Sequence, residues 1–103
     1  MILHKIISAI EQLAPSALQE SYDNSGLIVG NPNQEIHQAI ISFDVTEEVL
    51  EEAKAKGANL IISHHPIIFG GLKKLTGKNY VERCVLFAIK NDIALYAVHT
   101  NID

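Results

Sequence analysis

Two adjacent histidines stand at the end of an apolar run, in the stretch I-S-H-H-P-I-I-F-G-G. His64 and His65 follow a run that ends at Ser63, and Pro66 comes directly after them. Such a pair either opens an ordinary polar loop or provides metal ligands, because imidazole nitrogens commonly bind transition metals. Which of the two interpretations holds depends on whether other potential ligands lie near His64 and His65 in the fold.

Polar residues also follow two further apolar segments of the chain. Asp44 comes directly after residues 36–43, and the sequence H-T-N-I-D, from His99 to Asp103, comes after residues 93–98. In open α/β sheets the ligand crevice lies outside the carboxyl ends of the parallel strands. If these segments are parallel strands, three histidines and two carboxylates meet at one edge. That arrangement favours a metal site over a chance loop.

The adjacency of the two histidines bears on the number of metal ions. On a continuing strand, neighbouring side chains point to opposite faces, so one ion would not easily take both. At a strand end before Pro66, however, the rings of His64 and His65 can diverge enough to serve two neighbouring ions, with a carboxylate such as Asp103 completing or bridging them. Two divalent ions about 3.5–4 Å apart activate water and stabilise the attacking and leaving oxygens in hydrolases. A dinuclear hydrolytic site is therefore the working hypothesis.

Three helices are indicated by the spacing of apolar residues and by their capping residues. The first covers residues 3–13 and ends before a proline. The second runs from about Glu47 to Lys56, with Thr46 as its N-cap and Gly57 in the left-handed position past its end. The third ends near Asn91. Its apolar stripe consists of Val81, Cys84, Val85, Ala88 and Ile89.

The segments between these helices are predicted strands. They are Leu27–Val29, Ile36–Phe43, Asn59–Ser63 and Ile93–Val98. The first lies between two groups of turn residues and is expected to be a short edge strand or one arm of a hairpin. The other three are continuously apolar, which is typical of parallel strands covered on both faces. Strands that alternate with helices of about ten residues predict an α/β fold.

Composition and charge narrow the class of protein. The 103 residues, 48% of them hydrophobic, suffice for one globular domain. Apolar runs end well short of the ~18 residues of a membrane span, and the start of the chain lacks the pattern of a secretory signal, so a soluble, unsecreted protein is expected.

The single cysteine, Cys84, fits a reducing cytoplasm, and we expect it in the core rather than as a nucleophile. The net charge of -4, with scattered basic residues, argues against nucleic-acid binding.

Three motifs together resemble the NIF-three-like family, many of whose members are labelled GTP cyclohydrolase 1 type 2 homologs. They are Y-D-N-S-G-L-I-V-G at 22–30, S-H-H-P-I-I-F-G-G at 63–71 and A-V-H-T-N-I-D at 97–103. The resemblance spans essentially the whole chain, although Tyr22 and Ser25 stand where the family often has tryptophan and valine. It implies an α/β protein with a mainly parallel or mixed sheet and helices on both faces. It further implies two similar halves, ring-shaped homohexamers, and two metal ions in the cleft between the halves.

The resemblance also implies roles for single residues. His64 and His65 would each ligate one of two divalent ions (Zn, Fe or Mn), Asp103 would be a further ligand, and His99 would lie beside the metals in a supporting or acid–base role. Family members are more than twice as long, and their remaining ligands, a histidine and a glutamate one helical turn apart, come from the C-terminal half. Residues 1–103 are therefore expected to be the N-terminal half, with an incomplete site. His4 and His37 are expected at the surface.

The substrate is left open by these residues. The family label implies hydrolytic opening of the guanine ring of GTP, but a metal-dependent phosphoesterase would use the same histidines and aspartate. A third possibility is a non-catalytic protein that binds metal or partner proteins for regulation. A small-molecule substrate and self-association are expected partners, whereas nucleic acid and membranes are not.

Several further polar residues carry two interpretations each. Asp44 is either a site residue at its strand end or a plain helix cap. Asp23 and Asn24 either position a site group or only form a turn, and turn formation is the simpler explanation. Lys73 and Lys74 could contact phosphates, but their segment lacks the spacing of a phosphate-binding loop, which favours a solvated loop.

Overall fold

From β2 (Ala39–Ser42) onward, strands and helices alternate along the chain as the sequence predicts. The computed structural model describes residues 1–13, 26–67 and 74–98. Its elements are α1 (Leu3–Leu13), β1 (Gly26–Val29), β2 (Ala39–Ser42), α2 (Glu47–Lys56), β3 (Leu60–Ser63), α3 (Tyr80–Lys90) and β4 (Ala94–Ala97). The strands form one sheet in the order β1-β4-β3-β2, in which β2, β3 and β4 are parallel and β1 is antiparallel to β4. The predicted α/β fold with a mixed sheet is confirmed, and β1 is an edge strand as expected.

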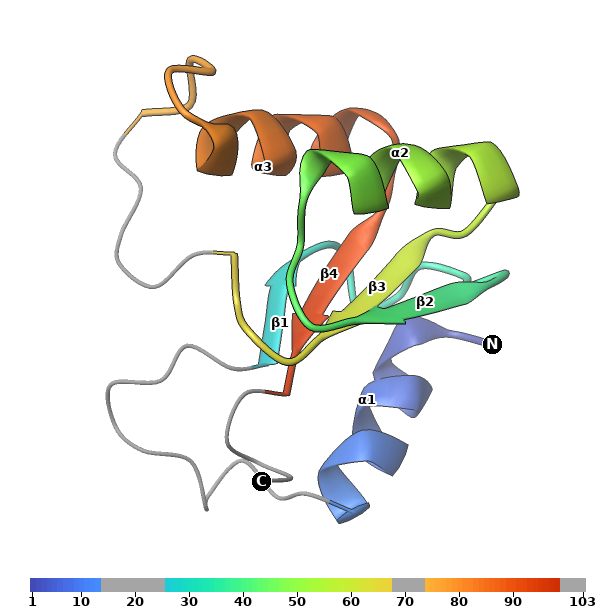
Figure 1. Cartoon of the computed structure of the whole chain (residues 1–103). Coiled ribbons are helices and arrows are strands. Elements are labelled where there is room, and N and C mark those ends of the chain that lie inside the picture. Colours follow the sequence, from blue (N-terminus) through green and yellow to red (C-terminus); the bar gives the residue numbers. More distant parts are fainter. Residues whose placement is uncertain (14–25, 68–73, 99–103) are drawn as a thin grey trace.

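Helices cover both faces of this sheet (Figure 1). Helices α2 and α3 lie side by side on one face, where a core that includes Leu50, Ile61 and Cys84 separates them from the strands. Helix α1 lies on the other face, over a smaller core that includes Leu3 and Tyr96. The prediction of helices on both faces is therefore confirmed, and Cys84 is the core residue that its place on the apolar stripe predicted.

The ends of α2 and α3 follow from local side-chain chemistry. The hydroxyl of Thr46 accepts a hydrogen bond from the backbone N–H of Val49 at 3.1 Å, and Gly57 ends α2 with φ of 76°. Both agree with the prediction. Asn79 caps α3 in the same way, because its side-chain oxygen accepts from the N–H of Glu82 at 2.9 Å. These caps set where each crossover leaves and rejoins the sheet.

Two apolar positions differ from the expectation of full coverage. Ile41 of β2 is 82% exposed and Phe43, just past its end, is 74% exposed, because β2 is the outer parallel strand of the sheet. Ile89, which was assigned to the apolar stripe of α3, is half exposed. Continuous apolar sequence therefore predicts burial correctly for β3 and β4 but not for β2.

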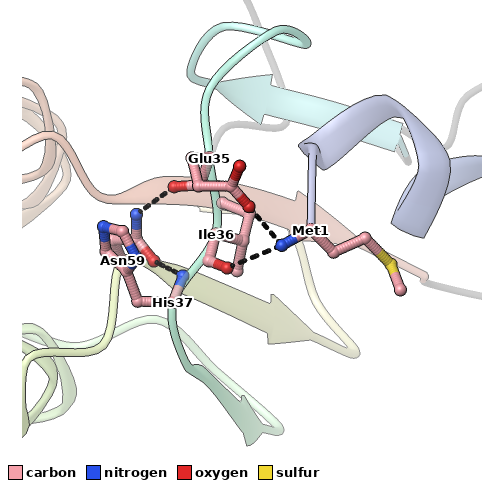
Figure 2. A network of polar contacts seen from close by, with 5 residues as sticks. All are labelled: Met1, Glu35, Ile36, His37 and Asn59. Carbon is pink, nitrogen blue, oxygen red and sulfur yellow. Dashed lines mark hydrogen bonds and ion pairs between the residues drawn. The ribbon is translucent and has the colours of Figure 1, made fainter.

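The strand predicted at Ile36–Phe43 is shorter in the structure, because its first residues make other contacts (Figure 2). The N–H of Ile36 donates to the carbonyl of Met1 at 2.9 Å, and the amino group of Met1 contacts the Glu35 carboxylate and the Ile36 carbonyl. The amide of Asn59 bridges this segment, donating to the carbonyl of Glu35 at 2.7 Å and accepting from the N–H of His37 at 2.9 Å. The segment before β2 is thus bound to the start of the chain.

The two histidines outside the metal hypothesis lie where the sequence placed them. His4 on α1 and His37 before β2 are both exposed. His37 lies at the amino end of β2, opposite the edge at which Asp44 leaves the same strand. In the described ranges no helix is long and apolar enough to cross a membrane.

Tyr96→Phe is expected to leave stability unchanged or to raise it by up to about 1 kcal/mol. Tyr96 is 1% exposed on β4, and its hydroxyl has no hydrogen-bond partner among the described residues. Burial, and to a smaller degree the charge of Glu11, raises the pKa of this phenol. Urea unfolding of both proteins measures the difference. A loss above about 1 kcal/mol would mean that the hydroxyl is hydrogen-bonded in solution.

Glu82→Gln is expected to destabilise the protein at neutral pH. One oxygen of the largely buried Glu82 carboxylate accepts backbone hydrogen bonds from Thr76, Gly77 and Lys78 at 3.0, 3.1 and 3.2 Å. These bonds, led by that of Thr76 and then that of Lys78, hold the pKa of Glu82 below its ordinary value of 4.5. The carboxylate therefore stabilises the fold above that ordinary value, and this contribution is lost as pH falls through the lowered pKa.

Unfolding of the wild type and Glu82→Gln as a function of pH tests this assignment. The difference in stability should be full at pH 7 and should shrink below pH of about 4.5. Glu82→Ala, which removes the acceptor as well as the charge, should be less stable than Glu82→Gln at every pH. A difference that does not change with pH would show that the charge of Glu82 contributes nothing.

Candidate metal centre

The site begins with two neighbouring strands that end in the same way. Strand β2 and its exit read I-I-S-F-D at 40–44, and β3 and its exit read I-I-S-H-H at 61–65. The parallel register pairs Ile40 with Ile61 and Ser42 with Ser63. Each residue of one pentapeptide therefore lies beside its counterpart in the other.

The serine that ends each strand shapes the residues that follow it. The Ser42 hydroxyl donates to the carbonyl of Asp44 at 2.7 Å, and the Ser63 hydroxyl donates to the carbonyl of His65 at 2.8 Å. Backbone hydrogen bonds continue past the strands, since the N–H of His65 donates to the carbonyl of Phe43 at 2.9 Å. Two matched turns thus follow the carboxyl ends of β2 and β3.

The two histidine rings lie close together at this edge. The ring centroids of His64 and His65 are 4.8 Å apart, with the ring planes inclined at 67°. The edge-to-face contact of Phe43 with His64 has a centroid distance of 5.9 Å. Both histidines are half-buried. The two rings therefore meet edge to face at the end of β3, and their service to two neighbouring ions stays a prediction.

Each histidine lines a different hollow beside the strand ends. His65 lines one of about 540 Å³ on the side of α2 and α3, together with Asp44 and Tyr80. His64 lines an apolar one of about 500 Å³ that also contains Ile10 of α1. The pair therefore stands between the two faces of the sheet, with space on either side.

Asp44 lies against His65. Its carboxylate Oδ1 is 2.7 Å from Nδ1 of the imidazole. The alternative interpretation of Asp44 as a helix cap is wrong, because Thr46 caps α2. Asp44 is thus a residue of the candidate site. The repeat of I-I-S before both residues is the sequence signal that could have paired it with His65.

The donor chemistry of this edge fits part of a metal site. Two imidazoles and a carboxylate are suitable ligands or supports for Zn, Fe or Mn. Within residues 1–13, 26–67 and 74–98, however, no three histidine, cysteine, aspartate or glutamate side chains are arranged to hold an ion. The expected ligand Asp103 and the expected supporting residue His99 lie outside the described residues. Of the four residues predicted to act at the metals, the described part of the chain therefore contains only His64 and His65, and their metal role stays a prediction.

The remaining candidates add little to this edge. Asp23, Asn24 and Lys73 also lie outside the described residues, and Lys74 is exposed. Burial, together with the charge of Glu47, raises the pKa of the Cys84 thiol, which agrees with a core residue. Tyr80, at the start of α3, lines the hollow beside His65 and was not found from the sequence, since nothing local marks it.

Comparisons with known proteins all point to one protein family. The model of the family described as Duf34/NIF3 (NGG1p interacting factor 3) matches residues 1–103. A Clostridium perfringens protein named GTP cyclohydrolase 1 type 2 homolog is 45% identical over 103 residues, which are 100% of this chain and 39% of the relative. The chain thus spans about two fifths of the length of that curated relative.

Solved structures agree with this result. A Bacillus cereus protein related to NIF3 superposes with a TM-score of 0.92 at 44% identity, over 98% of this chain and 28% of the other. A Staphylococcus aureus hypothetical protein superposes with a TM-score of 0.96 at 38% identity, over 100% of this chain and 34% of the other. The arrangement of α1 to β4 is therefore that of a segment of these longer chains.

Proposed function

Because the chain belongs to the Duf34/NIF3 family, we propose that His64 and His65 contribute to a dinuclear centre of divalent metal ions that serves a hydrolase. The observation that carries the proposal is the pair of histidine rings, 4.8 Å apart, at the carboxyl ends of parallel strands. Zn, Fe and Mn are the proposed ions, because imidazole and carboxylate groups are suitable ligands for all three.

The positions of the two rings support the proposal that each imidazole binds a different one of two neighbouring ions. The two rings line separate hollows, so they are not directed to a single point on one face of the sheet. When bound, a metal pair supplies Lewis acidity and activates water for attack. The chain's own residues hold the imidazoles in place through the turns after Ser42 and Ser63. His99 and Asp103 are proposed to complete the arrangement, as a supporting group and a ligand.

A small-molecule substrate is part of the proposal. The name of the Clostridium perfringens relative, GTP cyclohydrolase 1 type 2 homolog, favours ring opening of GTP over other hydrolyses. The hollow of about 540 Å³ beside His65 lies within the range of small-molecule sites. We further propose a cytoplasmic protein that assembles as a homohexamer in its full-length form.

Metal titration tests the centre. Calorimetry of Zn²⁺ and Mn²⁺ added to the metal-free full-length protein should show binding to the wild type. The double variant His64→Ala/His65→Ala should lose more than the roughly 10–100-fold in affinity that removal of a supporting group costs. The matched control is His4→Ala/His37→Ala, which removes the two exposed histidines far from this edge. Equal losses in both double variants, or no binding to the wild type, would contradict the proposal.

Activity assays separate the enzyme classes. With Zn, Mn or Fe present, the full-length protein should open the guanine ring of GTP, which changes its ultraviolet absorbance. Release of phosphate from phosphoesters without ring opening would assign a phosphoesterase instead. Metal binding without either reaction would assign a non-catalytic metal-binding protein. Both of the latter results would contradict the proposed reaction but not the metal centre.

A further inference from the structure

We infer that Asp44 is a positioning residue of this edge: its carboxylate holds His65 by Nδ1 and thereby puts the ring's lone pair on Nε2, the nitrogen that would bind a metal. The inference rests on the proposed function, since it assigns the orientation of one of the proposed ligands. It is carried by the 2.7 Å contact between Oδ1 of Asp44 and Nδ1 of His65.

The contact is built by the backbone on both sides. Asp44 and His65 occupy equivalent positions, two residues beyond the paired serines Ser42 and Ser63. Each serine hydroxyl donates to the backbone carbonyl of the residue two positions later, so both turns contain the same hydrogen bond. The N–H of His65 is bonded in addition to the carbonyl of Phe43. The backbone at the ends of the two adjacent strands therefore brings the Asp44 and His65 side chains into contact. The contact does not require long, flexible side chains.

Stability alone does not account for this pair. The side chains of Asp44 and His65 are 63% and 42% exposed, and an ion pair that is so open to water contributes little to folding. Thr46 already caps α2, so that helix does not need the carboxylate. What the contact does fix is the direction of a ring that lines a hollow at the carboxyl ends of parallel strands.

The chemistry of the two groups determines which nitrogen is left for a metal. An ionised carboxylate only accepts hydrogen bonds, so Nδ1 of His65 must carry the hydrogen. The neutral imidazole then has its lone pair on Nε2, and the carboxylate makes that nitrogen a stronger donor to a metal. The hydrogen bond thus selects a tautomer as well as a ring orientation.

Nitrogen NMR of the metal-free chain tests the orientation directly. Two-bond correlations between ring hydrogens and nitrogens distinguish the Nδ1–H from the Nε2–H tautomer. In the wild type at pH 8, His65 should be the Nδ1–H tautomer. In Asp44→Ala it should shift toward Nε2–H, and Asp44→Asn, which keeps the shape and a weaker acceptor, should lie between them. Glu48→Ala is the matched control, because it removes an exposed carboxylate from the first turn of α2. It should leave His65 unchanged.

Metal affinity gives the second measurement. Asp44→Ala should weaken Zn²⁺ binding by roughly 10–100-fold, as expected when the carboxylate support of a histidine ligand is lost, whereas Glu48→Ala should not. Circular dichroism of each variant checks that the fold is retained. If affinity falls while the His65 tautomer stays the same, Asp44 acts by its charge or as a direct ligand, and the positioning role is wrong.

Failure of the inference can be told apart from failure of the proposed function. A full-length wild-type protein that binds no Zn²⁺, although His65 is the Nδ1–H tautomer, contradicts the proposed metal centre and with it the metal role of Asp44. A wild-type chain that binds Zn²⁺, with a His65 tautomer that Asp44→Ala does not change, contradicts the inference alone. An unchanged Zn²⁺ affinity in Asp44→Ala, with a changed tautomer, also contradicts it.

Discussion

Gly30→Ala is expected to destabilise the chain by about 2–6 kcal/mol, which is a large part of the stability of a domain of this size. Gly30 has φ of 130°, a conformation that residues with a side chain rarely adopt. A Cβ atom there would lie 2.8 Å from Cβ of Ala94 and 3.2 Å from its Cα. Ala94 is fully buried on β4, so its backbone cannot move away without disturbing the centre of the sheet.

A second glycine separates the two causes of this loss. Gly26 has φ of 108°, but a Cβ at that position meets no atom of the described residues within 4 Å. Gly26→Ala should therefore show only the backbone strain, about 1–3 kcal/mol. Denaturant unfolding of both variants measures the difference. If Gly30→Ala is no less stable than Gly26→Ala, the close approach of Gly30 to Ala94 does not constrain the fold.

Local signals were sufficient to predict most of the elements. Thr46 before two acids, and Gly57 eleven residues after Thr46, placed both ends of α2 correctly, because capping depends on residues that are neighbours in sequence. The run Leu60–Ser63 was recognised as a buried strand because no polar residue interrupts its apolar part. Capping and apolar runs of this kind need no knowledge of the rest of the fold.

Features that depend on strand order were not predicted. Ile41 is as apolar as Ile62, yet it is exposed, because β2 is the outer strand of the sheet and β3 is an inner one. Sequence alone does not show which of the three parallel strands lies outside. The contact between Asp44 and His65 depends in the same way on the register of β2 against β3, which joins residues 21 positions apart.

Only part of the candidate site could be predicted from the sequence. The rule that ligand sites lie at the carboxyl ends of parallel strands brought Asp44, His64 and His65 to one edge, and the structure places them there. His99 and Asp103 follow β4, which is parallel to β3, but they lie outside the described residues. Their roles remain predictions.

Leu50→Ala is expected to destabilise the chain by about 2–5 kcal/mol and to lower its melting temperature by at least roughly 10 °C. Leu50 is fully buried on α2, in the core that also contains Ile61 of β3. Truncation removes apolar contacts and leaves a cavity between the helix and the sheet, which the packed neighbours fill only in part. Thermal unfolding followed by circular dichroism measures the shift.

The same substitution at Leu75, which is 41% exposed, is the control and should cost less than about 1 kcal/mol. A second readout separates packing from the site. Leu50 does not line either hollow beside His64 and His65, so at 10 °C, where the variant is still folded, the tautomer of His65 should match the wild type. A changed tautomer would mean that the position of α2 controls the approach of Asp44 to His65. An equal loss of stability at Leu50 and Leu75 would contradict the placement of Leu50 in the main core.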